Sequence, residues 1–290
     1  MKCEHIADIT GGQDGAVFGN YLFRFENNGE GRAYDVRDIV DGKGERVSEI
    51  ASFRLDKAEL ICPHSNSVVF GTEFYAEGEE FPLLYSNIYN NYAKANDQLK
   101  GVCCVYRLFR VEGGFDTELV QLIEIGFVDD AELWRMSPEA EGKRPYGNFV
   151  IDRERNIYYA FVMREQAEGT RYFSFDLPKV SAGVPDVRYG VKRVVLGKED
   201  VIEMFDCEHH NFVQGACCRN GRIYSLEGFN NKPGTDRPPA LRIIDASAKK
   251  QVCFINLADH GFDKEPEVID FFGDECICSD VYGKVYKLIF

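Results

Sequence analysis

The chain has 290 residues, of which 44% are hydrophobic and 13% aromatic, the composition of a globular protein. Its formal net charge is −14, from 34 Lys and Arg against 48 Asp and Glu. Proteins that bind nucleic acid or an anionic membrane surface present clusters of Lys and Arg, so this charge argues against both partners.

The N-terminal segment Met-Lys-Cys-Glu-His-Ile contains no apolar run like that of a secretory signal. No stretch approaches the roughly 20 apolar residues that a membrane helix needs. The ten cysteines include two adjacent pairs in apolar runs but no Cys-x-x-Cys spacing, so we expect them to be reduced and mostly buried. These features predict one domain, residues 1–290, in the cytoplasm.

One pattern of strands occurs five times along the chain. Each copy has a short apolar strand, an aromatic-rich second strand and a third strand similar to Val-Tyr-x-Phe-Asp; four copies add a fourth strand. First strands are expected near residues 16–18, 67–70, 148–151, 211–215 and 268–272, and second strands near 21–25, 82–86, 156–160, 221–225 and 275–279. Third strands are expected at 31–36, 102–108, 171–176, 241–245 and 283–288, and fourth strands at 47–53, 118–125, 192–196 and 251–257.

Five such copies are typical of the four-stranded blades of an all-β propeller. The last copy ends at Phe290 without a fourth strand, and residues 3–9 alternate like a strand, so we expect the N-terminal strand to complete the last blade. A short helix is expected at 129–136 or at 198–205. A β-sandwich is an alternative fold, and four or six blades are alternative counts because residues 126–147 could hide or lack a strand.

Signatures such as Gly-x-Ser-x-Gly, a Walker A loop and His-Glu-x-x-His do not occur. Residues 212–217 read Phe-Val-Gln-Gly-Ala-Cys, and residues 220–228 read Asn-Gly-Arg-Ile-Tyr-Ser-Leu-Glu-Gly. This short stretch resembles the Gln-Gly and Tyr-x-x-x-Gly pattern of glutaminyl-cyclotransferase-like propellers. The resemblance implies a propeller with a pocket on its axis and does not imply the cyclase reaction.

Polar residues that precede or begin the first strands should converge at one end of the propeller axis, where a ligand pocket is expected. Two long polar connections, residues 87–100 and 227–239, are expected on the same rim, and long polar loops on a rigid scaffold suit ligand recognition. The candidate ligand-binding residues are Asn66, Glu73, Tyr85, Asn148, Asn211, Gln214 and Glu227.

His64 and His209 occupy equivalent positions, each just before a first strand, and His210 follows directly. A histidine there could act as a general base near neutral pH, with Asp14 or Glu267 as its carboxylate partner. The same side chains could instead bond backbone carbonyls between blades or hold a divalent metal, although no metal site is assigned. Glycoside hydrolysis needs two carboxylates about 5–10 Å apart; the candidates are Asp14, Glu73, Asp152 and Glu267.

The sequence therefore predicts a propeller that binds a polar, sugar-like molecule or a protein partner at its axial rim. A carbohydrate-active hydrolase or lyase that uses the axial histidines and carboxylates is the alternative function.

Overall fold

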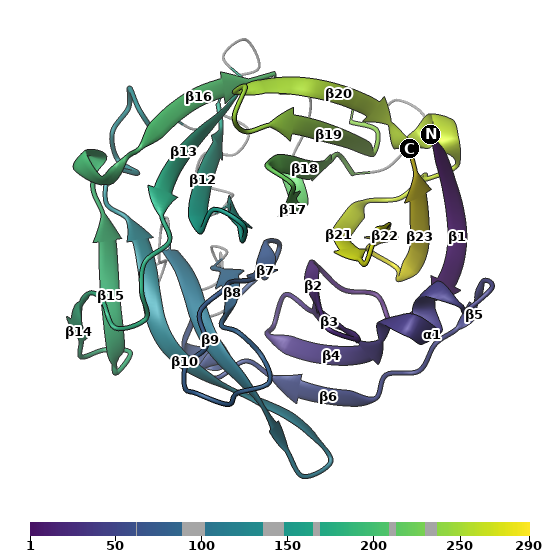
Figure 1. The fold of residues 1–290 in the computed structure, drawn as a ribbon, viewed down its shortest axis with the longest axis horizontal. Helices are drawn as coiled ribbons and strands as arrows, with labels where there is room; N and C mark the ends of the chain where they lie inside the picture. Colours follow the sequence, from purple (N-terminus) through teal and green to yellow (C-terminus); the bar gives the residue numbers. More distant parts are fainter. Residues whose placement is uncertain (62, 89–101, 136–147, 165–168, 209–212, 230–236) are drawn as a thin grey trace.

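The computed structural model describes residues 1–61, 63–88, 102–135, 148–164, 169–208, 213–229 and 237–290. Five sheets surround a central axis, as Figure 1 shows. The innermost strands are β2 (Gly15–Phe18), β7 (Val68–Phe70), β11 (Asn148–Asp152), β17 (Val213–Arg219) and β21 (Pro266–Phe272). The prediction of an all-β propeller with five blades is confirmed.

The remaining strands follow from the axis outwards. Blade one adds β3 (Tyr21–Phe25), β4 (Glu30–Asp35) and β6 (Ala51–Arg54), and blade two adds β8 (Leu84–Asn87), β9 (Val102–Val111) and β10 (Gly114–Ile125). Blade three adds β12 (Ile157–Met163), β13 (Thr170–Asp176) and β16 (Glu203–Cys207), and blade four adds β18 (Arg222–Glu227), β19 (Ala240–Asp245) and β20 (Lys250–Asn256). Blade five adds β22 (Glu275–Asp280), β23 (Lys284–Ile289) and β1 (Lys2–Asp8), with β5 (Glu45–Arg46) beyond β1.

The N-terminal strand closes the ring, as predicted. Strand β1 pairs antiparallel with β23, from Lys2 opposite Ile289 to Asp8 opposite Lys284. The two chain ends therefore lie side by side in blade five (Figure 1). Each terminal strand is therefore held by the other, and β5 covers the outer edge of β1 at Ala7 and Asp8.

The sheets pack against one another through apolar faces on both sides. Between blades one and two, the Phe23 ring lies edge-on to Phe70, Phe81 and Phe115, at centroid distances of 5.7, 5.4 and 5.2 Å. Aromatic pairs in this geometry add to the free energy gained by burying their area. A strand that is buried on both faces needs apolar side chains at successive positions, which explains the aromatic-rich second strands.

The fourth strand of blade three differs from the prediction. Residues 192–196 lie in β15 (Val191–Leu196), which pairs parallel with the outer edge of β10 in blade two and carries β14 (Val184–Asp186) beyond it. The outer edge of β13 is covered instead by β16, from Thr170 opposite Cys207 to Ser174 opposite Glu203. Both strands alternate in a similar way, so the sequence does not show which sheet edge each one pairs with.

Helices are few and short in the described part of the chain. They are α1 (Val36–Val40), α2 (Ala58–Ile61) and the 3-10 turns Lys198–Asp200 and Leu257–His260. The helix expected at 198–205 is wrong beyond its first turn because residues 203–205 belong to β16. Residues 129–135 form turns instead of the other expected helix, and residue 136 lies outside the described ranges.

None of the helices in the described ranges is long and apolar enough to cross a membrane. The described cysteines are free thiols, and six of them are buried. Burial raises the pKa of the Cys103, Cys217 and Cys278 thiols well above the usual range. A thiol kept in its neutral form is a poor nucleophile, so these three cysteines act as small apolar side chains.

Candidate functional site

The propeller has two faces that the strand order defines. Innermost strands begin, and second strands end, at the top face; innermost strands end at the bottom face. Polar side chains from all five blades collect around the axis at the top face, and each is at most 5% exposed. We call this set the axial polar layer; it consists of Asp14, Arg24, Asn66, Ser67, Asn87, Asn148, Gln214, Glu267 and Asp280.

Asp14 directly precedes β2 and connects blade one to blade two. Its Oδ2 accepts a hydrogen bond from the backbone N–H of Val68 at 2.9 Å, and its own N–H donates to the Ser65 carbonyl at 3.1 Å. Burial raises the pKa of the Asp14 carboxyl well above its usual range. The carboxyl is therefore poised to hold a proton.

Arg24 lies in β3 and connects blade one to blade five. Its Nη1 donates to Ser279 Oγ at 2.9 Å, and its Nη2 donates to the carbonyls of Gly12 and Asp280 at 2.8 and 2.7 Å. Burial lowers the pKa of the guanidinium, and the nearby carboxylates, with Glu267 the strongest, oppose this shift. A buried cation among carboxylates holds the two blades together.

Amide side chains continue the layer through the other three blades. The Asn87 amide donates to Asn66 Oδ1 within blade two and to Asn148 Oδ1 in blade three, the latter at 3.3 Å. The Gln214 amide in blade four donates to Glu265 Oε1 in blade five at 2.6 Å. Hydrogen bonds therefore join neighbouring blades two and three, and four and five, at this level.

Blade four comes closest to the axial polar layer at Gly215. A Cβ placed on Gly215 would lie 1.9 Å from the Glu267 carbonyl oxygen and 2.7 Å from Asp14 Oδ1. Blade four therefore approaches blades one and five so closely that a side chain does not fit. Gly215 therefore lies in direct contact with the part of the axial polar layer that Asp14 forms.

Several polar atoms of the layer have no well-aligned hydrogen bond to any described residue. These atoms are Asp14 Oδ1, Arg24 Nε, Ser67 Oγ and Asp280 Oδ2. Buried polar groups in folded proteins are nearly always hydrogen-bonded, and exceptions often mark a functional site or a bound molecule. The set combines hydrogen-bond acceptors with donors, so it suits a ligand whose groups both donate and accept hydrogen bonds.

The structure places Asp14, Asn66, Asn148, Gln214 and Glu267 at the top face. His64, just before β7, is half-buried. His209, His210 and Asn211 lie outside the described residues. So do residues 89–101 and 230–236, which make up most of the two connections expected on the rim.

Two other candidates, Glu73 and Tyr85, lie away from the layer, and a third, Glu227, lies at the top face in an ion pair. Glu73 lies in the connection between β7 and β8, which starts from the bottom face, and accepts from the Val180 N–H at 2.9 Å. Tyr85 is fully buried in the apolar core between blades. Glu227 ends β18 at the top face, where its buried carboxylate pairs with the Arg242 guanidinium at 2.6 Å. The expected axial positions of Glu73 and Tyr85 are corrected because Glu73 follows β7 at the bottom face and Tyr85 is buried in the core between blades.

Asp152 also lies at the bottom face, at the end of β11, where its Oδ2 pairs with Arg155 Nε at 2.7 Å. Asp14 and Glu267 are therefore the carboxylate candidates that remain together. Within the described ranges, no three His, Cys, Asp or Glu side chains are grouped closely enough to hold a metal ion.

Sequence reasoning missed Arg24, Ser67, Asn87 and Asp280. Asn87 and Asp280 end second strands at the top face; Asn87 enters the prediction only as the first residue of the connection 87–100, and Asp280 does not enter it. A signal for Arg24 exists, because it is the one charged residue in the segment Tyr-Leu-Phe-Arg-Phe. A charge in a strand that is buried on both faces needs a partner.

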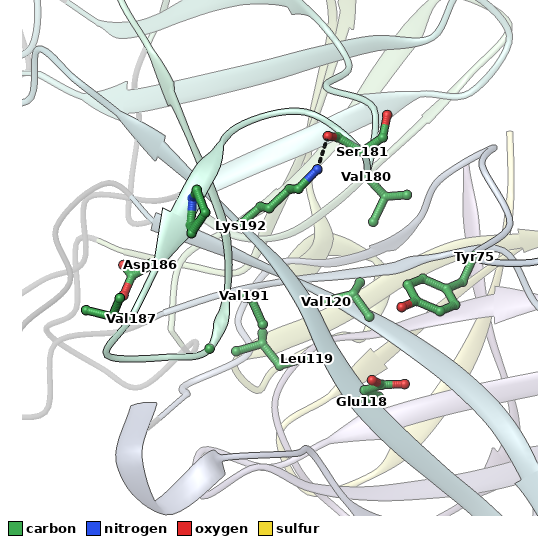
Figure 2. A pocket seen from close by; sticks show the side chains of 12 residues that line it. Tyr75, Glu118, Leu119, Val120, Val180, Ser181, Asp186, Val187, Val191 and Lys192 are labelled. Atoms are coloured by element: carbon green, nitrogen blue, oxygen red, sulfur yellow. Dashed lines mark hydrogen bonds between the residues drawn. The ribbon is translucent and has the colours of Figure 1, made fainter.

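Two pockets lie outside the axial polar layer. One, of about 400 Å³, is at the bottom face and is lined by Thr72, Arg153, Glu154, Cys218, Arg219, Asp270 and Phe271. The other, of about 600 Å³, is a groove on the side of the propeller between β10 and the β14–β15 hairpin. Figure 2 shows this groove, with Leu119, Val120 and Val191 among its apolar lining and Lys192 bonded to the Ser181 carbonyl.

No family model matches the sequence, and no curated protein matches it. Among solved structures, the chain is similar to the glutaminyl cyclase of Myxococcus xanthus, with 9% identity over 98% of this chain and 97% of that chain and a TM-score of 0.49. It is also similar to BamB from Moraxella catarrhalis (7% identity, 97% of this chain and 60% of that chain, TM-score 0.35) and to the computationally designed protein Ika8 (9%, 99% and 100%, 0.36). At these values, none of the three indicates an activity, and the fold assignment rests on the sheet order of this chain.

Proposed function

We propose that this propeller binds a neutral or cationic polar small molecule, sugar-like in its hydroxyl groups, at the top face of its axis. The observation that carries the proposal is the set of unbonded polar atoms in the axial polar layer, Asp14 Oδ1, Arg24 Nε, Ser67 Oγ and Asp280 Oδ2. An unbonded buried polar group costs about 1–3 kcal/mol. A hydroxyl-rich ligand offsets this cost because each hydroxyl both donates and accepts.

The charge of the layer favours this class of ligand over an anion. Asp14, Glu267 and Asp280 face a single arginine, Arg24, and all four are buried. Even with Asp14 protonated, the negative charge of the remaining carboxylates matches or exceeds the positive charge of Arg24. A phosphorylated or acidic molecule would add repulsion in a site of low dielectric constant.

The direct test is a binding screen of the full chain against neutral sugars, amino sugars and polyols, by isothermal titration. Ser67→Ala should weaken binding about three- to tenfold because one hydrogen bond to the ligand is lost. It should leave folding intact because the Ser67 hydroxyl bonds no described residue. Ser48→Ala, at an exposed serine, is the matched control and should not change binding. Failure of every ligand class to bind would contradict the proposal.

A glycoside hydrolase or lyase is the second candidate, and the pKa of Asp14 favours it. A carboxyl whose pKa burial raises is better suited to act as a general acid, with Glu267 as the second carboxylate at the same face. Asp14→Asn separates the two functions. The amide keeps an acceptor for the Val68 N–H and a donor in place of the acid proton, so binding should persist, whereas hydrolysis of chromogenic glycosides should be lost.

A further inference from the structure

The bottom-face pocket of about 400 Å³ lies where four innermost strands end. Thr72 follows β7, Arg153 follows β11, Arg219 ends β17, and Asp270 and Phe271 lie near the end of β21. Two guanidinium groups from neighbouring blades therefore face a single mouth at the opposite end of the axis from the axial polar layer.

Arg153 is exposed, and its contact within the described chain is with the Phe18 ring, 5.6 Å from the guanidinium carbon to the ring centroid. It makes no ion pair shorter than 4 Å with a described carboxylate. Its hydrogen-bond donors are therefore available at the pocket. A guanidinium presents five N–H donors in a planar fork that matches the oxygens of phosphate or sulfate.

Arg219 is held in place from its outer side. It donates to the Gly273 carbonyl and to Asp274 Oδ1, the latter at 2.7 Å, and its guanidinium lies over the Phe271 ring at 4.6 Å. The side chain is 27% exposed, so the fixed guanidinium still reaches solvent. An oriented cation binds an anion with less loss of conformational entropy than a mobile one.

Asp270 regulates the charge of this pocket. Its Oδ2 accepts from the Val17 N–H at 2.7 Å and its Oδ1 from the Phe271 N–H at 2.8 Å. Burial raises the pKa of Asp270 to about 6, and Arg153 and Arg219 oppose the shift. The other titratable groups that face it are Asp14, Cys217 and Cys276, and Glu154 lines the same pocket.

We propose that this pocket binds a small molecule through a phosphate or sulfate group, held between Arg153 and Arg219. The oxygens of the group accept from both guanidinium groups, and the Thr72 hydroxyl lies at the same mouth. Protonation of Asp270 removes a competing negative charge, so the oxyanion binds more tightly as the pH falls through about 6. This site lies at the opposite end of the axis from the proposed top-face ligand.

The test titrates the full chain with inorganic sulfate, whose charge is constant between pH 5 and pH 8, at fixed ionic strength. We expect saturable binding at one site, about fivefold tighter at pH 5 than at pH 7.5. Arg153→Gln should weaken binding about tenfold, whereas Arg46→Gln, at an exposed arginine in β5, should not change it. A parallel titration with inorganic phosphate at pH 7.5 shows which oxyanion is preferred.

Asp270→Asn should abolish the difference between the two pH values and bind sulfate at pH 7.5 as tightly as the unmodified chain does at pH 5. Sulfate binding that is absent up to about 50 mM at both pH values would overturn the proposal. Equal affinity in Arg153→Gln and Arg46→Gln would overturn it as well. The affinity of Arg153→Gln tests the proposal even if substitutions of Arg219 prevent folding. Arg153 makes no ion pair with a described carboxylate, so its replacement should leave the fold intact.

Discussion

The two ends of the propeller axis use the same chemical groups under opposite conditions of burial. At the top face, Arg24 is 2% exposed and donates to three acceptors in blades one and five. At the bottom face, Arg153 is exposed and packs on one ring. The first arginine is part of the structure that joins the blades, whereas the second is free to meet a ligand from solvent.

The comparison teaches that position along an innermost strand decides the role of a polar residue. Asp14 directly precedes β2 and Asp270 lies near the end of β21, and each accepts a hydrogen bond from a backbone N–H of a neighbouring blade, from Val68 and Val17. Burial raises the pKa of both. Asp14 faces a closed layer of polar side chains, whereas Asp270 faces an open pocket with two arginines, so their ligands should differ in charge.

The largest difference between the two ends should appear on removal of Arg24. Arg24→Met leaves Glu267 and Asp280 buried without their cation, so we expect a loss of about 4 kcal/mol in the free energy of unfolding. Urea denaturation at pH 7 measures it. A loss below about 1 kcal/mol would show that Arg24 does not hold blades one and five together.

Gly215→Ala should be the next largest effect because the added Cβ meets the Glu267 carbonyl at 1.9 Å. Overpacking of this kind costs about 3 kcal/mol when backbone must move. Gly114→Ala is the matched control, since its added Cβ meets Ala51 at an ordinary 3.4 Å. If the two variants unfold at the same urea concentration, the close approach of blade four to blade five at Gly215 does not constrain the fold.

Asp270 should make stability depend on pH at the bottom face. Its folded pKa of about 6 lies above the ordinary value of 3.8, so the fold favours the protonated form. The contribution is complete below about pH 4 and is lost as the pH rises through 6, by about 2–3 kcal/mol. The stability of the unmodified chain minus that of Asp270→Asn should fall by this amount between pH 4 and pH 7.5. A difference that stays constant with pH would contradict it.

Arg153→Gln should have the smallest effect on stability, within about 0.5 kcal/mol of the unmodified chain, because an exposed arginine with a single ring contact contributes little. Thermal denaturation at pH 7 checks it. A loss as large as that of Arg24→Met would remove the distinction between the two ends.

The repeat of apolar and aromatic strands was enough to predict five blades and the closing role of residues 3–9, because period-2 patterns and turns are local features. The pairing of residues 191–196 with blade two could not be predicted, because the choice of sheet edge depends on long-range packing. The same dependence on long-range packing explains which site residues could be predicted and which could not. The positions of Asp14 and Gln214 follow from their place at the start of an innermost strand, whereas the position of Tyr85 depends on the direction of its side chain, which is set by register.

The measurement that tests the proposed top-face site most directly is the titration of Ser67→Ala, Ser48→Ala and the unmodified chain with the tightest ligand found in the sugar and polyol screen. We predict that Ser67→Ala folds with unchanged stability and binds about three- to tenfold more weakly, while Ser48→Ala binds normally. Identical affinities in all three proteins would contradict a ligand seated on the axial polar layer.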